Sequence, residues 1–271
     1  MKLSEVYKIV NEFEPKALSD EYCEKYSAYD NSGILIDSGE DVKGVLFSLD
    51  LSFAAIEKAK ETGANLIVTH HPAIYGKIDS IRACDFKPLG KKIVACLKNG
   101  ISLIAMHLNL DMAIDGIDES LMNGIARSMG AGMRSTENVA VMYPLSQGGY
   151  GRAYDVKESS LYALAEKIKS EFKTERVLVY GDAQRTIKRV ASFCGAGADE
   201  GTVAFAAANG AEVMISSDFK HHVLSLALES GVCAIAITHY ASENYGFEKY
   251  YKKIRERIEI PCVYHTDEDL L

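Results

Sequence analysis

The sequence predicts an α/β protein with two pseudo-repeated β-α-β-α-β lobes and a metal site in the cleft between them. Apolar runs of strand length alternate with helix-like segments, and the same order of elements occurs twice along the chain. A glycine follows each repeated helix, where a left-handed cap is expected. Polar residues follow the predicted strands in both copies, and open α/β sheets bind their ligands at that edge.

The composition is typical of a globular protein with a full core, since 48% of the 271 residues are hydrophobic and 25% are charged. The formal net charge of −8 disfavours nucleic acid as the main partner, because phosphate binding needs a basic surface. The six cysteines form no C-x-x-C pair and indicate no disulfide framework. The amino terminus has no apolar signal core, and no apolar run approaches the ~20 residues of a membrane span. We therefore expect a cytoplasmic protein with no membrane partner.

The elements up to the end of the first copy can be placed from local signals. Ser4 can cap a helix that Pro15 ends. The further elements are a helix at 18–26, strands at 34–36, 44–49, 65–69 and 101–106, and helices at 52–61 and 89–98. Gly63 and Gly100 close the two helices of this copy.

The second copy repeats this order. Its strands are expected at 190–193, 212–216 and 232–238, and its helices at 202–208 and 223–229. Gly210 and Gly231 take the places that Gly63 and Gly100 have in the first copy. The duplication predicts that the two halves carry equivalent strand ends.

The domain organisation follows from the two copies. Residues 1–143 are expected to form the first lobe and residues 188–271 the second, with a connector at 144–187. The remaining expected elements are a helix at 159–172 and a strand at 177–180 in the connector, a closing helix at 243–257 and a last strand at 262–264.

Four polar groups follow equivalent strand ends, and six of the seven histidines belong to them. They are His70 with His71, His107 with Asp111, Asp218 with His221 and His222, and His239 with Glu243. His239 and Glu243 are four residues apart, so they share one face of a helix that begins at about His239. Imidazole and carboxylate ligands suit a pair of divalent metals ~3.5–4 Å apart, bridged by a carboxylate and a water or hydroxide. The sequence therefore predicts a dinuclear metal centre.

Most of these residues also have an ordinary structural interpretation. His107 alone would be a hydrogen-bonded residue at a strand end, and Asp218 could cap the helix after it. Asp111 could cap the following turn. His221 and His222 could support a metal ligand or simply face solvent.

The same residues resemble the motifs of the Nif-three-like dinuclear metal-centre family, whose members are named GTP cyclohydrolase I type II homologues. The resemblance rests on Thr69-His70-His71-Pro72, on His107-Leu108-Asn109-Leu110-Asp111 and on Thr238-His239-Tyr240-Ala241-Ser242-Glu243. Weaker support comes from residues 29–33 and 217–221. Together these motifs cover essentially the whole chain in the right order.

Three positions depart from the family's pattern. Tyr29 stands where the family usually has Trp, and Thr238 stands where it usually has Gly. Ser216-Ser217-Asp218 replaces the usual T-G-D/E. None of these departures removes a metal ligand, so they concern the contacts to the substrate.

The resemblance implies metal ligation by five residues, with Glu243 as the bridging ligand. They are His70, His71, Asp111, His239 and Glu243. It also implies two-lobed chains that assemble as a toroidal homohexamer with the sites facing an inner cavity. We expect two divalent metal ions per chain, with zinc, iron, manganese and nickel as candidates.

We expect a metal-dependent hydrolase in which a metal-bridging hydroxide attacks a small-molecule substrate. Asp218 or His221 could serve as the catalytic proton shuttle. The family's cyclohydrolase name implies a purine nucleotide as substrate and ring opening by activated water. The alternatives are a metal carrier or chaperone and an interaction scaffold with a structural metal pair. Five protein ligands leave open coordination positions on two metals, which favours catalysis over a structural role.

Overall fold

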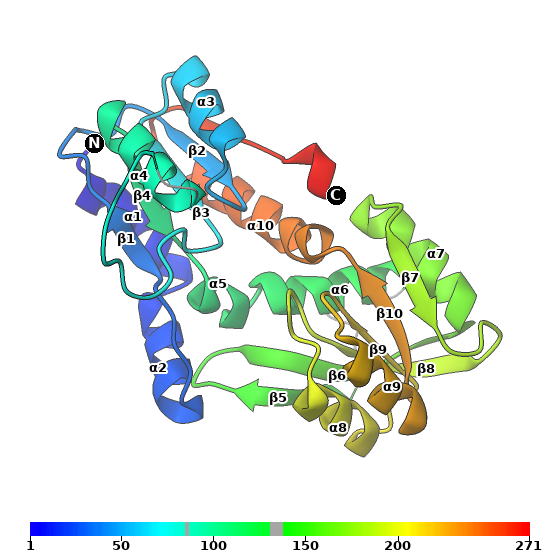
Figure 1. Cartoon of the computed structure of the whole chain (residues 1–271). Helices are drawn as coiled ribbons and strands as arrows, with labels where there is room; N and C mark the ends of the chain where they lie inside the picture. The colour runs from blue at the N-terminus through cyan, green and yellow to red at the C-terminus, as the bar shows by residue number, and fades with distance from the viewer. Residues whose placement is uncertain (85–86, 131–137) are drawn as a thin grey trace. The chain divides into compact units, whose positions relative to one another are not determined.

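The structure is a mixed α/β fold with one sheet in each of two units, which confirms the predicted fold class (Figure 1). The computed structural model describes residues 1–84, 87–130 and 138–271. Unit 1 comprises Met1–Ala113 and Phe247–Asp267, and unit 2 comprises Ile114–Gly246 and Glu268–Leu271. Helix α10 (His239–Arg255) begins in unit 2 and ends in unit 1.

Unit 1 is built on a five-stranded sheet with the strand order β1-β4-β3-β2-β11. The strands are β1 (Gly33–Ile36), β2 (Val45–Ser48), β3 (Leu66–Thr69), β4 (Ser102–Ala105) and β11 (Cys262–Tyr264). Strands β2, β3, β4 and β11 are parallel, and β1 runs antiparallel to β4. Every residue of β2, β3 and β4 is buried, as expected for parallel strands that are covered on both faces.

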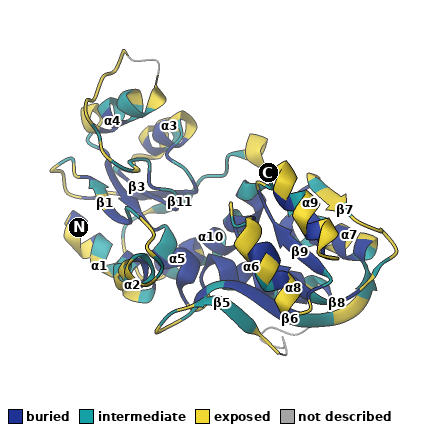
Figure 2. Cartoon of the chain, turned by 60° about the horizontal axis from the view of Figure 1, so that its bottom comes forward, coloured by how far each residue is buried: buried dark blue, intermediate teal, exposed yellow. Residues whose placement is uncertain are grey.

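Helices cover both faces of this sheet. They are α1 (Leu3–Phe13), α2 (Lys16–Tyr26), α3 (Phe53–Thr62), α4 (Pro88–Lys98) and the short α5 (Leu108–Met112), together with the end of α10. On one face, Ile56 of α3 and Ile93 of α4 pack in a core cluster with strand residues. On the other face, the ring of Phe47 lies 6.4 Å from that of Phe247 and 6.2 Å from that of Tyr250. Figure 2 shows the central strand β3 as buried.

Unit 2 is built on a six-stranded sheet with the strand order β5-β6-β8-β9-β10-β7. The strands are β5 (Ala140–Pro144), β6 (Gly149–Ser160), β7 (Val177–Tyr180), β8 (Thr186–Ser192), β9 (Val213–Ser216) and β10 (Cys233–Ile237). The helices are α6 (Ile117–Ser128), α7 (Leu161–Phe172), α8 (Glu200–Ala208), α9 (His221–Glu229) and the start of α10, with a short 3₁₀ turn at Glu268–Leu270. Val203 of α8 and Val223 of α9 pack on Met214 in one core cluster, while α6 and α7 pack on each other and on β6.

The expected internal duplication is visible in the order of the elements. In unit 1, β2-α3-β3-α4-β4 has the same order and the same parallel pairing as β8-α8-β9-α9-β10 in unit 2. Gly63 and Gly210 follow equivalent helices with φ of +74° and +69°, a conformation that strains an L side chain. Because parallel strands end at one edge, each unit presents a row of strand ends.

The two units differ in their bounds from the lobes expected at 1–143 and 188–271. The first segment of unit 1 ends at Ala113, because α6 packs on α7 and β6 in unit 2. Strand β11 belongs to unit 1, because it pairs with β2. Residues 144–187, expected as a connector, contribute β6, α7 and β7 to unit 2.

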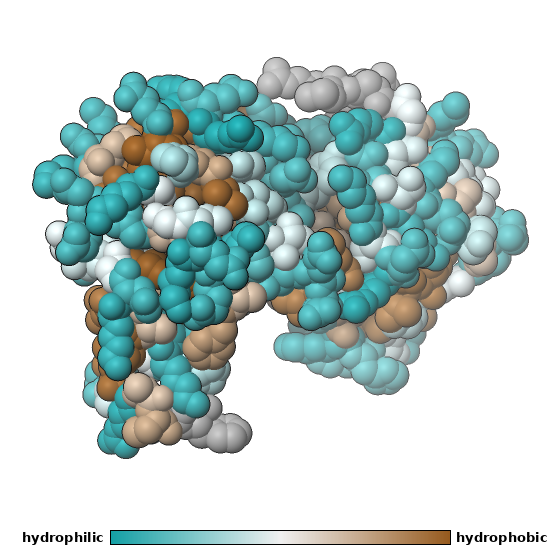
Figure 3. Space-filling model, turned by 90° about the horizontal axis from the view of Figure 1, so that it is seen from above, coloured by the Kyte–Doolittle hydropathy of each residue, from teal (hydrophilic) through white to brown (hydrophobic). Residues whose placement is uncertain are grey.

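None of the helices in the described part of the chain has both the length and the apolar character that a membrane span requires. The face seen in Figure 3 is largely hydrophilic, and its hydrophobic residues form separate small patches. Isolated exposed apolar side chains of this kind are ordinary on a protein surface.

Gly124→Ala is expected to lower the free energy of unfolding by about 1–2 kcal/mol, although alanine favours a helix by ~1 kcal/mol. The added Cβ would lie 2.7 Å from Cζ of Phe172 and 3.0 Å from Cε1 of Tyr245, so buried rings would have to move. Urea unfolding measures the effect. Asn123→Ala, on the same helix and half-buried, is the control and should stay within about 0.5 kcal/mol of the parent. Equal losses in both variants would contradict the packing argument.

Candidate functional site

In unit 1, three histidines follow the carboxyl ends of adjacent parallel strands. His70 and His71 follow β3, and His107 follows β4, whose residue Ala105 is paired with Thr69. The backbone N–H groups of His70 and His71 both donate to the carbonyl of Leu49 beyond the end of β2, at 3.1 and 3.0 Å. The strand register therefore brings these three imidazoles to one edge of the sheet.

The three imidazoles form a close cluster. The ring of His70 lies 4.7 Å from that of His71 and 5.2 Å from that of His107, measured between centroids. One ring nitrogen from each histidine lies within 4.8 Å of the corresponding atom of the other two. His70 is fully buried, whereas the side chains of His71 and His107 are 24% and 20% exposed. Such a group can hold a metal ion.

Each of these histidines has its Nδ1 tied to an oxygen atom. His70 Nδ1 donates to the carbonyl oxygen of Met106 at 2.8 Å. His71 Nδ1 donates to Asp50 at 2.9 Å, and His107 Nδ1 donates to Asp30 at 2.7 Å. A carbonyl oxygen only accepts, so the tautomer of neutral His70 carries its proton on Nδ1 and directs the lone pair of Nε2 outward. Histidines that bind metals characteristically make this kind of hydrogen bond through the other ring nitrogen.

Asp111 lies opposite one of these lone pairs. Helix α5 begins directly after His107, and the backbone N–H of Asp111 donates to the His107 carbonyl at 2.9 Å. This single turn buries the Asp111 carboxylate with its Oδ1 3.5 Å from Nε2 of His70. A lone pair that faces a carboxylate oxygen is favourable only when a proton or a metal cation lies between them.

Asp30 and Asp50 each accept from a histidine Nδ1 in unit 1, and Asp30 is the more buried of the two. Burial alone would raise its pKa, but the hydrogen bond and the charge of His107 lower the pKa by more, with help from the hydroxyls of Ser19 and Ser32. Those hydroxyls donate to Asp30 Oδ2 at 2.6 and 2.5 Å. Ser32 also accepts from the backbone N–H of His107 at 3.1 Å. The Asp30 carboxylate is thus held ionised as a fixed acceptor for the His107 ring.

Two exposed tyrosines lie beside this cluster. The Tyr75 ring lies 6.3 Å from that of His107 and 5.2 Å from that of Tyr29. The Tyr75 hydroxyl donates to the Tyr29 carbonyl at 2.8 Å, which ties the two loops together. Tyr29, where the family pattern has Trp, therefore keeps an aromatic ring near the histidines.

In unit 2, the second group is made by the first turns of α10. The helix begins at His239, directly after β10, so Nε2 of His239 lies 3.0 Å from Oε1 of Glu243 one turn later. Glu243 is buried with 4% of its surface exposed. His239 Nδ1 donates to Asp218 at 2.6 Å, which repeats the arrangement of the first unit.

Two backbone conformations create this second group. Asp218 follows β9 with a φ of +52°, a left-handed conformation that Asp tolerates better than most residues. Gly195 follows β8 with a φ of +57°, and a Cβ there would collide with the Glu243 carboxylate and lie 3.3 Å from Nε2 of His239. Only glycine leaves room for the carboxylate and the imidazole at this position.

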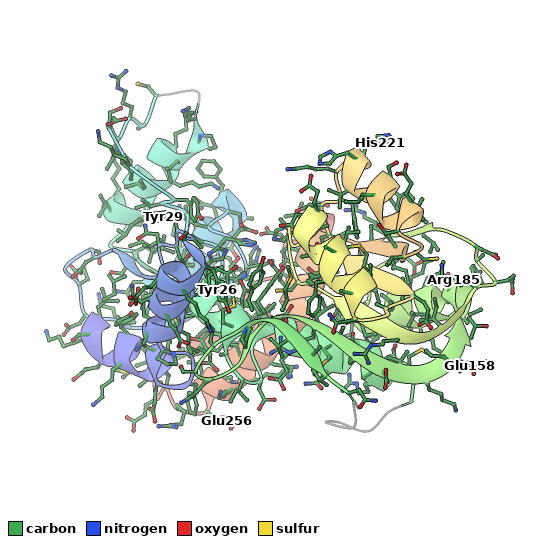
Figure 4. The ribbon with its side chains drawn as sticks, turned by 90° about the horizontal axis from the view of Figure 1, so that it is seen from below. Tyr26, Tyr29, Glu158, Arg185, His221 and Glu256 are labelled. Atoms are coloured by element: carbon green, nitrogen blue, oxygen red, sulfur yellow. The ribbon has the colours of Figure 1, made fainter. Side chains whose placement is uncertain are left out.

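The structure separates the expected site residues into those that join a group and those that do not. His70, His71, His107 and Asp111 lie together in unit 1, and Asp218, His239 and Glu243 lie together in unit 2. His221 stands at the exposed start of α9 (Figure 4). His222 pairs with Glu200 at 2.9 Å, with both side chains more than 60% exposed. The cap of α9 is Lys220, so Asp218 is not the N-cap that one interpretation suggested.

Sequence reasoning missed three residues at the same sheet edge of unit 1. Asp50 directly follows the expected strand at 44–49, so its position carried the same signal as that of His70. His265 follows β11, and its Nε2 lies 3.1 Å from Asp267. Asp30 lies in segment 29–33, which supported only the family resemblance, because its partner His107 is far away in the sequence.

Comparisons with known proteins extend over nearly the whole chain. Residues 1–268 match the family described as Duf34/NIF3 (NGG1p interacting factor 3). A Clostridium perfringens protein named GTP cyclohydrolase 1 type 2 homolog is 29% identical over 262 residues, which cover 96% of this chain and 93% of the relative. A Methanocaldococcus jannaschii protein of the same name is 26% identical, with 97% and 98% covered.

Solved structures agree with this match. The Staphylococcus aureus protein SA1388 superposes with a TM-score of 0.79 at 26% identity, covering 98% of this chain and 96% of that one. Reduced HcgD from Methanocaldococcus jannaschii superposes with a TM-score of 0.78 at 25% identity, covering 97% of each chain.

Asp218→Asn is expected to weaken the binding of a divalent ion such as Zn²⁺ by about 10–100-fold. The neutral amide lacks the carboxylate charge that fixes the tautomer of His239. The readout is a competition titration of metal-free protein against a chromogenic chelator. Glu200→Gln removes the carboxylate of the exposed His222 pair and serves as the control, with affinity unchanged. If the two variants weaken binding equally, Asp218 does not support a metal ligand.

Proposed function

The chain belongs to the Duf34/NIF3 family, and from this premise we propose that it is a dinuclear divalent-metal protein that acts as a metal-dependent hydrolase. Membership confirms the resemblance inferred from the motifs. The relatives carry the name GTP cyclohydrolase 1 type 2 homolog, which supports a nucleotide-related small molecule as the substrate.

One observation carries the metal proposal. Four histidines, three at strand ends of unit 1 and one at the start of α10 in unit 2, each donate from Nδ1 to an oxygen acceptor. This leaves Nε2 as the atom that can bind a metal, and in His70 and His239 it faces a carboxylate oxygen at 3.5 and 3.0 Å. Neutral imidazole beside carboxylate is a donor set that divalent first-row metals accept.

The proposed ligands are the five that the family resemblance implies. They are His70, His71 and Asp111 from unit 1, and His239 and Glu243 from unit 2, with Glu243 as the bridging ligand. His107 is a further candidate, because its ring clusters with those of His70 and His71.

Bound divalent metals would supply a water of lowered pKa and a Lewis acid for the substrate. The chain's own residues would prepare the site for this chemistry. Asp30 and Asp50 fix the rings of His107 and His71, and Asp218 fixes that of His239. We therefore propose Asp218 as an orienting residue, with His221 kept as the candidate proton shuttle.

The substrate is proposed to be a nucleotide with a planar ring. The ring of Tyr75 lies beside that of His107 and the ring of Tyr29 lies beside that of Tyr75, and each tyrosine is more than half exposed. Aromatic side chains offer stacking faces to nucleobases. A toroidal homohexamer, as the resemblance implies, is part of the same proposal, and light scattering on the purified protein tests it.

Elemental analysis of protein purified without added metal or chelator should find about two equivalents of divalent metal per chain. His71→Ala should lower this to one or none, because a ligand is lost. His222→Ala, which removes an exposed histidine outside both groups, should keep two equivalents. Little metal in the parent protein, even after reconstitution, would refute the dinuclear centre.

Turnover decides between a hydrolase and its alternatives, a metal carrier and a scaffold with structural metals. With GTP as the probe, Glu243→Ala should lower the rate more than about 100-fold, beyond the loss typical of supporting residues. Glu248→Ala, on the same helix at an exposed pair with Lys252, should keep the rate. Transfer of metal to an apo-acceptor without any turnover would favour the carrier instead.

A further inference from the structure

Unit 1 contains a cavity that holds none of the proposed metal ligands. It has a volume of about 440 Å³ and is formed by the segment around Lys77–Arg82 and the first turns of α4. This volume is within the ~300–1,000 Å³ range of small-molecule pockets. The cavity is therefore large enough for a ligand of its own, and this goes beyond the proposed function.

The polar lining of the cavity is mainly cationic. Among the described residues of the lining, Lys77, Arg82 and Lys87 are cationic and Asp79 is acidic. This is unusual in a chain with a formal net charge of −8. Lys77 and Asp79 are paired at 3.0 Å, but both side chains are at least 80% exposed. Exposed pairs of this kind contribute ~0–1 kcal/mol, so an incoming anion can replace Asp79 as the partner of Lys77.

The floor of the cavity is apolar. Ile93 is buried in the core of unit 1, and Ile78 and Leu89 pack against that core while they line the cavity. Cations above an apolar floor match a ligand that has both an anionic group and a carbon skeleton or ring. Lysine and arginine are the usual partners of phosphate groups.

A glycine gives the cavity its wall. A Cβ at Gly90 would collide with the backbone carbonyl and the backbone nitrogen of Arg82. The segment that carries Arg82 can therefore lie directly on the first turn of α4 only because position 90 has no side chain. This contact places Arg82 beside the start of α4, where Lys87 also lines the cavity.

We propose that this cavity binds a phosphate-bearing small molecule, with its phosphate held by Arg82, Lys87 and Lys77 and its carbon skeleton on Ile78, Leu89 and Ile93. The phosphate provides most of the affinity. The site is selective for phosphate esters over their dephosphorylated forms, and its affinity falls as salt concentration rises.

Isothermal titration calorimetry on the full chain tests this with three probes: pyrophosphate, GMP and guanosine. Pyrophosphate and GMP should bind saturably, and guanosine should not. Tighter binding of GMP than of pyrophosphate supports the contacts to the carbon skeleton, and the reverse order would overturn that part of the proposal. The charge reversal Arg82→Glu with Lys87→Glu should weaken both phosphate probes at least tenfold.

Lys8→Glu with Lys43→Glu is the matched control, because it makes the same change in net charge at exposed lysines of unit 1 outside the cavity. It should change the affinity less than about twofold. Gly90→Ala gives an independent test, because it disturbs the wall without changing any charge, and it should also weaken binding. Thermal melts establish that each variant folds, and Lys87→Gln replaces the double variant if it does not.

His71→Ala separates this proposal from the metal proposal, because phosphate probes could also bind to metals. Binding that survives in His71→Ala but is lost in the Arg82 and Lys87 variant supports the cavity site whatever the metal content is. Absence of saturable binding in the parent protein would overturn the proposal. Equal losses in the lysine control, or loss in His71→Ala alone, would also overturn it.

Discussion

The hydrogen bond from His70 Nδ1 to the Met106 carbonyl is the constraint on which the first group of ligands depends. It joins the end of β3 to the end of β4 at 2.8 Å in a fully buried environment. Because the carbonyl can only accept, the bond selects one tautomer of neutral His70 and points its Nε2 at Asp111. The parallel register of β3 and β4 places His71 and His107 at the same edge.

Unit 2 reaches the same arrangement with a different backbone. Its histidine is on a helix rather than at a strand end, and the partner of its Nδ1 is Asp218 in a left-handed conformation. The carboxylate comes from the next turn of that helix, and Gly195 makes room for it. The duplicated β-α-β-α-β frame therefore provides equivalent edges, while the polar residues on each edge are specific to the unit. A fold repeat supplies positions, and the chemistry depends on the residues that occupy them.

Much of the site could be predicted because it depends on local pattern. Apolar runs locate β3, β4, β9 and β10, and the residue after each run must then lie at the carboxyl edge. Glu243 could be placed beside His239 because four residues make about one helical turn. These inferences need only the period of the secondary structure and the duplication.

The remainder depends on contacts between distant segments. The helix α6 lies in a region where no element was expected, and most of its residues are buried, because it packs on α7 and β6. Strand β6 runs over twelve residues from Gly149, in a part of the expected connector where no strand was predicted, because it pairs with both β5 and β8. The role of Asp30 could not be predicted either, since His107 is 77 residues away.

Charge balance gives a physical reason for a bound cation beside these histidines. The two groups contain five carboxylates close to their histidines, namely Asp30, Asp50 and Asp111 in unit 1 and Asp218 and Glu243 in unit 2. Asp111 and Glu243 are at least 95% buried, and burying an ionised carboxylate is costly unless a cation compensates it. Neutral imidazoles offer no positive charge, so a cation must come from outside the chain or from protonation. A metal cation bound in either group would offset part of this charge, and metal binding would then stabilise the fold that arranges its ligands.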